Sequence, residues 1–130
     1  MTLPFWCLFV AIFIPIVLAG IGGYHRSQQF GTPDNNAPRQ QAAKLTGAGA
    51  RAVAAQENAW EGLIVFACAV FVNHLAGGDP LWAGRFAIVF VLARISHAAC
   101  YLADLATPRS LSYAVAMASC IALFVSAARA

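Results

Sequence analysis

Long apolar segments constrain the fold of this chain more than any other feature. Residues 1–24 contain no charged side chain, and residues 3–23 alone supply about 20 largely apolar residues, enough for one helical crossing of a bilayer. Three further apolar segments follow, separated by turn-forming residues. We therefore predict an all-α integral membrane protein, a single domain of residues 1–130 built as a bundle of four transmembrane helices. The predicted helices cover residues 3–23, 51–75, 81–105 and 110–128.

The alternative interpretation of the first segment is a cleaved signal peptide. A signal peptide carries a basic leader before its apolar stretch and small residues at a cleavage site after it. The first segment has no basic leader and no clear small-residue cleavage pattern. We therefore expect this segment to remain in the protein as a membrane helix.

Composition supports a lipid environment and argues against two kinds of partner. Hydrophobic residues make up 61% and charged residues 10% of the chain, whereas soluble domains carry about a quarter charged residues. No basic run with interleaved aromatic residues occurs, so we expect no nucleic-acid partner. The 4 cysteines lie in apolar segments without a CxxC pair or a His/Cys cluster, so we interpret them as buried small residues and expect no metal site. They are Cys7, Cys68, Cys100 and Cys120.

The polar stretch at residues 25–50 is the one long loop, and basic residues predict its side of the membrane. Short turns at residues 77–80 and 106–108 make neighbouring helices antiparallel, so the long loop and the 106–108 turn share one side. Basic residues flank that side at Arg26, Arg39, Lys44, Arg51 and Arg109, and the other side at Arg85 and Arg129. The positive-inside rule then places the long loop in the cytoplasm and both termini in the periplasm of a bacterial inner membrane.

Polar residues recur along one stripe of the second predicted helix and one stripe of the third. Their spacing of three, four or seven residues places each set on a single helix face. The second helix carries Arg51, Asn58 and Glu61, and the third carries Arg94, His97, Tyr101 and Asp104. Because a charge deep in a bilayer costs at least roughly 2.5 to 3.5 kcal/mol, we expect the stripes to face each other, with Glu61 pairing with Arg94. This pair either belongs to a binding site or only joins two helices. A lone histidine such as His97 is more often a hydrogen-bonded interior residue than a catalyst.

The start of the fourth predicted helix lies at the same membrane surface as these stripes. Arg109 and Ser110 occupy it, and the free N–H groups and the dipole of a helix N-terminus favour an anion. We therefore expect a small anionic ligand at this surface. Aromatic residues elsewhere are interpreted as packing or membrane-interface anchors: Phe66, Phe71, Trp82, Phe86 and Phe90.

Together, these patterns resemble the MAPEG family, the membrane-associated proteins in eicosanoid and glutathione metabolism. The resemblance runs from about residue 31 to the end of the fourth helix. Residues 51–61 (RAVAAQENAWE) are similar to the family pattern in which an Arg precedes Asn-x-x-Glu. Residues 93–102 (ARISHAACYL) are similar to its Arg-x-x-His-x-x-x-Tyr signature, and residues 109–113 (RSLSY) resemble the start of its fourth helix.

The resemblance implies a homotrimer of four-helix subunits that holds glutathione between adjacent subunits near the cytoplasmic surface. It also implies a transferase or peroxidase that uses glutathione as cosubstrate and takes a lipophilic electrophile from the membrane lipids. By this resemblance Arg109 has the catalytic role, because a guanidinium favours the nucleophilic thiolate over the thiol. The implied glutathione-binding residues are Arg26, Arg51, Gln56, Asn58, Glu61, Arg94, His97, Tyr101, Ser110 and Tyr113.

The chain departs from the family pattern at a few positions. Ala54 stands where many eicosanoid-type members carry an Arg, and Val65 stands where a proline is usual. The spacing from Tyr101 to Arg109 differs by one residue from that of some members. A non-catalytic member of the same family is therefore an alternative to an enzyme.

A small transporter is the second alternative, from another class of function. In that case Glu61, Arg94 and His97 relay protons or bind an ion. Transport favours a continuous polar path, whereas polar residues thin out beyond Arg94 and Glu61 toward the far side. We therefore prefer a pocket that opens on one side.

Overall fold

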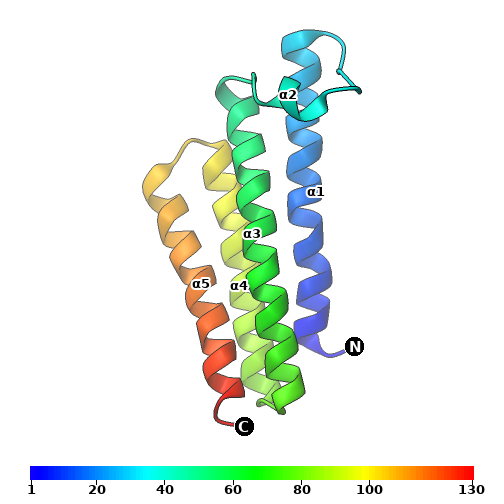
Figure 1. Cartoon of the computed structure of the whole chain (residues 1–130). Coiled ribbons are helices and arrows are strands. Elements are labelled where there is room, and N and C mark those ends of the chain that lie inside the picture. The colour runs from blue at the N-terminus through cyan, green and yellow to red at the C-terminus, as the bar shows by residue number, and fades with distance from the viewer.

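The computed structural model describes residues 1–130 as a bundle of long antiparallel helices. The elements are α1 (Leu3–Phe30), α2 (Pro38–Ala42), α3 (Gly47–Ala76), α4 (Pro80–Leu102) and α5 (Ala106–Ala127). In Figure 1 both termini lie at one end of the bundle, the terminal end, and α2 with its loop lies at the other, the loop end. The 4 helices other than α2 are long and apolar enough to cross a membrane. This confirms the predicted four-span membrane bundle.

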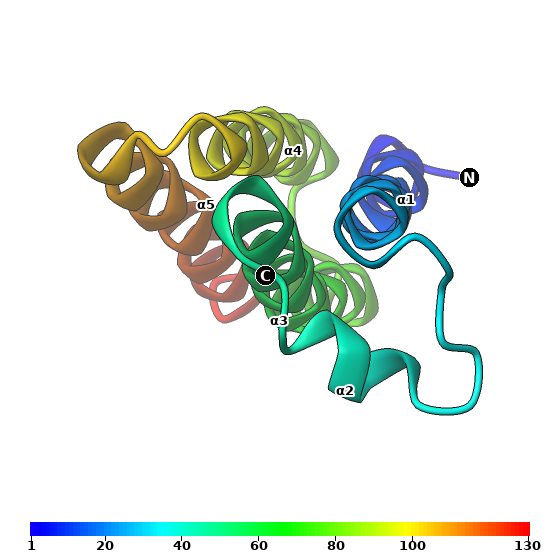
Figure 2. The same cartoon turned by 90° about the horizontal axis from the view of Figure 1, so that it is seen from above.

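Helix α3 is the element around which the others pack. It contacts α1, α4 and α5, whereas α1 and α5 do not contact each other. Seen from above in Figure 2, α1 and α5 lie on opposite sides of the α3–α4 pair. Residues on the two flanks of α3 therefore face different neighbours, and this separation decides which candidate site residues can meet within one chain.

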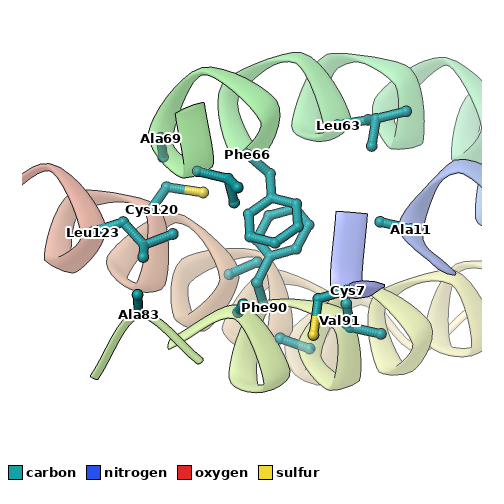
Figure 3. Packing of buried hydrophobic residues seen from close by; sticks show 14 residues of the cluster. Cys7, Ala11, Leu63, Phe66, Ala69, Ala83, Phe90, Val91, Cys120 and Leu123 are labelled. Atoms are coloured by element: carbon teal, nitrogen blue, oxygen red, sulfur yellow. The ribbon is translucent and has the colours of Figure 1, made fainter. Parts of the chain in front are cut away.

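The core is held by small residues packed around two aromatic rings. Phe66 on α3 and Phe90 on α4 are fully buried and stack with ring centroids 3.9 Å apart (Figure 3). Ala87 and Ala116 are also fully buried, and Leu123 of α5 belongs to the same cluster. Small side chains let helix backbones approach closely, which is how helices associate in lipid, where there is no hydrophobic drive between them.

Large apolar side chains cover the outside of the bundle. Ile64, Leu92 and Ile121 are each more than 60% exposed, at 64%, 61% and 63%. In water such a surface would be an aggregation liability, but in a bilayer the hydrocarbon chains cover it. The outer surface thus agrees with the membrane assignment made from the sequence.

The first helix is longer than the sequence analysis predicted. It continues through the polar residues 24–30 to Phe30 and ends at Gly31, whose φ of 75° favours a residue without a side chain. Polarity ends a membrane span but not a helix, and no glycine or proline interrupts residues 24–30. The predicted loop at residues 25–50 is correspondingly shorter and contains α2, and α3 begins at Gly47.

The last helix also begins earlier than predicted. Ala106 to Pro108, expected to be a turn, form the first turn of α5, where proline is tolerated because the N–H groups there have no helical partner. The Arg109 N–H already donates to the Leu105 carbonyl at 3.2 Å. The prediction of free backbone donors at Arg109 and Ser110 is therefore wrong, because such donors belong to the residues before Pro108.

The cysteines differ from one another in exposure. Cys7 and Cys120 are buried, Cys100 is half-buried and Cys68 is exposed. The prediction of a buried thiol is therefore wrong for Cys68. Its apolar sequence neighbours gave no sign of this, because in a membrane helix the outward face is apolar too.

Candidate functional site

A buried arginine joins α3 and α4 about midway along the bundle. Arg94 is 2% exposed, and its Nη2 donates to both the backbone carbonyl and the side-chain Oδ1 of Asn58, at 2.8 Å each. Gly62 makes room for the guanidinium, because a Cβ on this glycine would lie 3.1 Å from Arg94 Cζ. Arg94 therefore crosses from one helix to the other over a notch in α3.

The predicted pairing of Arg94 with Glu61 is absent within the chain. The only ion pair joins Arg51 to Asp104, and Glu61 lies on the exposed surface of α3. Glu61 follows Asn58 by three residues, so it lies roughly 60° further round the helix, away from α4. The neutral amide of Asn58, and not the carboxylate, reaches the arginine.

Arg94 keeps one donor group without a partner. Its Nη1 is buried and makes no hydrogen bond. The buried His97 lies one turn further along α4, on the same face. A cation with a spare buried donor makes this layer of the bundle electropositive, which suits an anionic ligand nearby.

An aromatic and cationic cluster leads from this layer to the loop end. The His97 ring lies edge-on to Tyr101 at 5.6 Å and tilted against Tyr113 of α5 at 6.1 Å. The Arg109 guanidinium lies over the Tyr101 ring, 4.5 Å from its centroid. The structure therefore brings together four of the predicted site residues, His97, Tyr101, Arg109 and Tyr113, across α4 and α5.

Arg51 approaches the same region from α3. Its Nε donates to the Leu102 carbonyl at 3.3 Å, and its Nη1 lies 3.6 Å from Asp104 Oδ2. Both partners belong to the end of α4 and the turn that follows it. Arg51 is thus bound to protein atoms in this chain.

Two of the predicted residues, Arg26 and Gln56, lie elsewhere. They line a hollow of about 200 Å³ between α1, α2 and α3, together with Arg39. Arg26 donates from Nη1 to the Pro38 carbonyl at 3.3 Å, and its Nε is buried without a partner. Gln56 and Asn58 lie roughly 160° apart around α3. Within one chain the candidate residues therefore form two half-sites, on opposite flanks of α3.

The remaining predicted residues lie on the surface. Glu61 and Ser110 are exposed, and Tyr113 is 42% exposed while still contacting His97. The largest hollow, about 590 Å³, is lined by residues such as Trp82 and Arg129 at the terminal end and contains none of the predicted site residues. Size alone would therefore point to the end of the molecule opposite to the predicted site residues.

Sequence reasoning missed two contributors to this geometry. Gly62 was not singled out, although a glycine inside a helix that carries a polar stripe often marks a close approach. Arg39 was regarded only as a topology determinant, but it lines the same hollow as Arg26 and Gln56. Its neighbour Pro38, which begins α2, was the available signal that this part of the loop is ordered.

Comparison with known families identifies the kind of protein. A model of the MAPEG family matches residues 3–129. The chain belongs to the MAPEG family. A search of curated proteins gave no match. Family membership makes this a membrane protein of the glutathione and eicosanoid metabolism type, and it confirms the resemblance read from the three sequence motifs.

Proposed function

We propose that this MAPEG protein binds glutathione at the loop end and acts as a glutathione transferase or peroxidase on lipophilic electrophiles. The observation that carries the proposal is the cluster in which the Arg109 guanidinium lies over Tyr101, with Asn58 held by Arg94 on the neighbouring helix. Cations and hydrogen-bonding groups meet there at the edge of an apolar bundle. A peptide anion and a lipid-soluble second substrate can both reach such a place.

The proposed chemistry depends on the thiolate of glutathione. A free thiol has a pKa of about 8.5, so only a few per cent is ionised at neutral pH. A guanidinium next to the sulfur stabilises the thiolate and lowers the thiol pKa. In the transferase reaction the thiolate attacks an electrophilic carbon and forms a thioether. In a substitution the carbon releases its leaving group with the bonding electrons, and in an addition to a double bond the displaced π electrons take up a proton from water. We assign this thiolate stabilisation to Arg109.

The proposed site is completed by a second copy of the chain. Arg26 and Gln56 lie on the flank of α3 opposite to the Arg109 cluster, so one chain presents each half-site to a different neighbour. A ring of three copies would join the half-sites in pairs, as expected for the family. Exposed Glu61 and Ser110, with Asn58, His97 and Tyr113, complete the proposed glutathione contacts.

The proposed location is a bacterial inner membrane, with the loop end in the cytoplasm. Five cations lie in the segments that meet at the loop end: Arg26, Arg39, Lys44, Arg51 and Arg109. The positive-inside rule supports this orientation. Periplasmic activity of a reporter fused after Ala130 is the expected result. A cytoplasmic reporter would place the site on the side away from the cytoplasmic glutathione pool.

Glutathione binding is the test of this proposal. Calorimetry on the detergent-solubilised protein should detect binding at millimolar glutathione, and a difference spectrum in the ultraviolet should show the thiolate. Loss of one charge-assisted hydrogen bond in Arg109→Ala should weaken binding by about 1.5 to 3 kcal/mol, roughly ten- to a hundredfold. Arg85→Ala is the matched control, because Arg85 contacts Trp82 at the terminal end. Absence of binding by the wild-type protein would rule out the enzyme.

A non-catalytic family member is the second candidate, and Ala54 favours it. Many related enzymes carry an arginine at this position, whereas the alanine here cannot make that contact. If glutathione binds without a thiolate band, Ala54→Arg should restore the band. The transporter alternative is disfavoured, because the Phe66–Phe90 stack and its apolar neighbours fill the bundle on the terminal side of Arg94.

A further inference from the structure

The turn between α4 and α5 has an unusual backbone conformation. Only residues 103–105 separate the two helices, and Asp104 has a φ of 60°. Asp104 is the single non-glycine residue in the chain with a positive φ. Aspartate tolerates this left-handed region better than most residues, but it still adopts it at a cost. Backbone bonds from the Asp104 N–H to the Tyr101 carbonyl at 3.2 Å and from the Leu105 N–H to the Cys100 carbonyl at 2.9 Å close this turn, and side-chain contacts add to them.

Arg51 supplies two such contacts from α3. Its Nε donates to the carbonyl of Leu102, which ends α4, where carbonyls lack helical partners. Its Nη1 lies 3.6 Å from the carboxylate of Asp104, the residue with the positive φ. The two contacts use different edges of one planar guanidinium, an arrangement that a lysine does not reproduce.

The clamped turn leads directly to Arg109. The Arg109 N–H bonds to the carbonyl of Leu105, the last residue of the turn. Arg109 therefore lies near the start of α5, shortly after the turn. Its guanidinium lies over the Tyr101 ring of α4, 4.5 Å from the ring centroid. Because three residues join the helices, the conformation at Asp104 sets where Arg109 lies relative to Tyr101.

We propose that Arg51 is a positioning residue: through Leu102 and Asp104 it fixes the α4–α5 turn and thereby holds Arg109 over Tyr101. This replaces its predicted role as a glutathione ligand. The inference about catalysis rests on the proposed function, since it concerns the guanidinium assigned to the thiolate. Placement of Arg109 itself is a property of the chain without any ligand.

The placement is measured by fluorine NMR of 3-fluorotyrosine at Tyr101, in a Tyr24→Phe/Tyr113→Phe background that leaves one tyrosine. Arg109→Ala gives the resonance of an uncovered ring. Arg51→Ala should shift the resonance most of the way to that position, and Arg51→Lys should shift it part of the way. Arg85→Ala, at the other end of the bundle, should leave it unchanged. An unchanged resonance in Arg51→Ala would overturn the proposal.

Asp104→Gly provides a second variant that is not expected to impair folding, because glycine accepts a φ of 60° without strain. It removes the carboxylate and leaves the Leu102 contact intact. We expect a resonance shift in the same direction as in Arg51→Ala, but smaller. A shift in the opposite direction would contradict the clamp.

The catalytic consequence is tested at saturating glutathione, where affinity no longer matters. Arg51→Ala should lower the thiolate-to-thiol ratio at neutral pH by roughly threefold, the effect of raising a thiol pKa by about half a unit, and the thiolate absorbance should fall accordingly. If Arg51 only binds glutathione, affinity falls but the absorbance at saturation is unchanged, which would overturn the positioning role. If the wild-type protein binds no glutathione, the proposed function fails, and the Tyr101 resonance alone decides whether Arg51 positions Arg109.

Discussion

Two layers of the same bundle are buried equally well but held in different ways. In the apolar layer, Phe66 and Phe90 stack at 3.9 Å among alanines, and shape alone fixes the contact. In the polar layer, one turn of α4 away, Arg94 is 2% exposed and is held by hydrogen bonds to Asn58. One of its donors, Nη1, still has no partner.

The difference shows where the chain tolerates an unfavourable group. A void in the apolar layer would cost the protein only van der Waals contacts. A buried charge without a full set of hydrogen bonds in the polar layer costs desolvation energy that no interaction offsets. Stability alone would favour an apolar residue at position 94. The burial of Arg94 beside His97 is therefore the reason why we propose the polar layer, and not the apolar one, as the functional part of the bundle.

The largest expected effect comes from removing a ring of the apolar layer. Phe66→Ala should lower the free energy of unfolding in detergent by about 3 to 5 kcal/mol, because the ring is fully buried and its neighbours close the space only partly. Phe13→Ala is the control, since Phe13 is 48% exposed on the lipid-facing side of α1. Equal losses in thermal unfolding for the two variants would mean that the stacked pair is not the core.

The intermediate expected effect is a difference in stability between the alanine variants of Asn58 and Glu61 in the polar layer. Asn58→Ala removes a side-chain hydrogen bond to a buried cation and should lower stability by about 1.5 to 3 kcal/mol. Glu61→Ala should change it by less than about 0.5 kcal/mol, because Glu61 is exposed and has no ion pair in the chain. Chemical denaturation without glutathione measures both. A larger loss for Glu61→Ala would restore the pairing expected from the sequence.

The smallest expected effect is a change in the free energy of unfolding whose sign differs between alanine substitutions at two helix glycines. Alanine at Gly62 gains about 1 kcal/mol of helix propensity, but its Cβ would press on Arg94 at 3.1 Å, so we expect a net loss of about 1 kcal/mol. Gly20→Ala meets nothing within 4 Å and should be stabilising by up to about 1 kcal/mol. Denaturation midpoints of the two variants give the comparison. Stabilisation by both would show that Arg94 moves aside easily.

The sequence predicted most of the fold and part of the site. Spacing placed Asn58 on the stripe that meets α4, and it placed His97 and Tyr101 on one face of that helix, as the structure has them. It did not distinguish Asn58 from Glu61 as the partner of Arg94. Residues three apart in a helix point in directions that differ by about 60° around the helix axis. The crossing of α3 and α4 therefore decides whether Asn58 or Glu61 faces Arg94. Opposite charge was the more obvious signal, and it was wrong.

What the sequence determined by itself is the number of membrane spans, their antiparallel order and the end of the bundle that carries the cations. These follow from local properties: apolar length, turn residues and the positions of arginines along the chain. The tertiary structure decided that Arg26 and Gln56 lie on the far flank of α3 from Arg109, and that Arg51 binds the α4–α5 turn. Both depend on how the helices are rotated against each other, which small residues such as Gly62 permit and no single segment encodes.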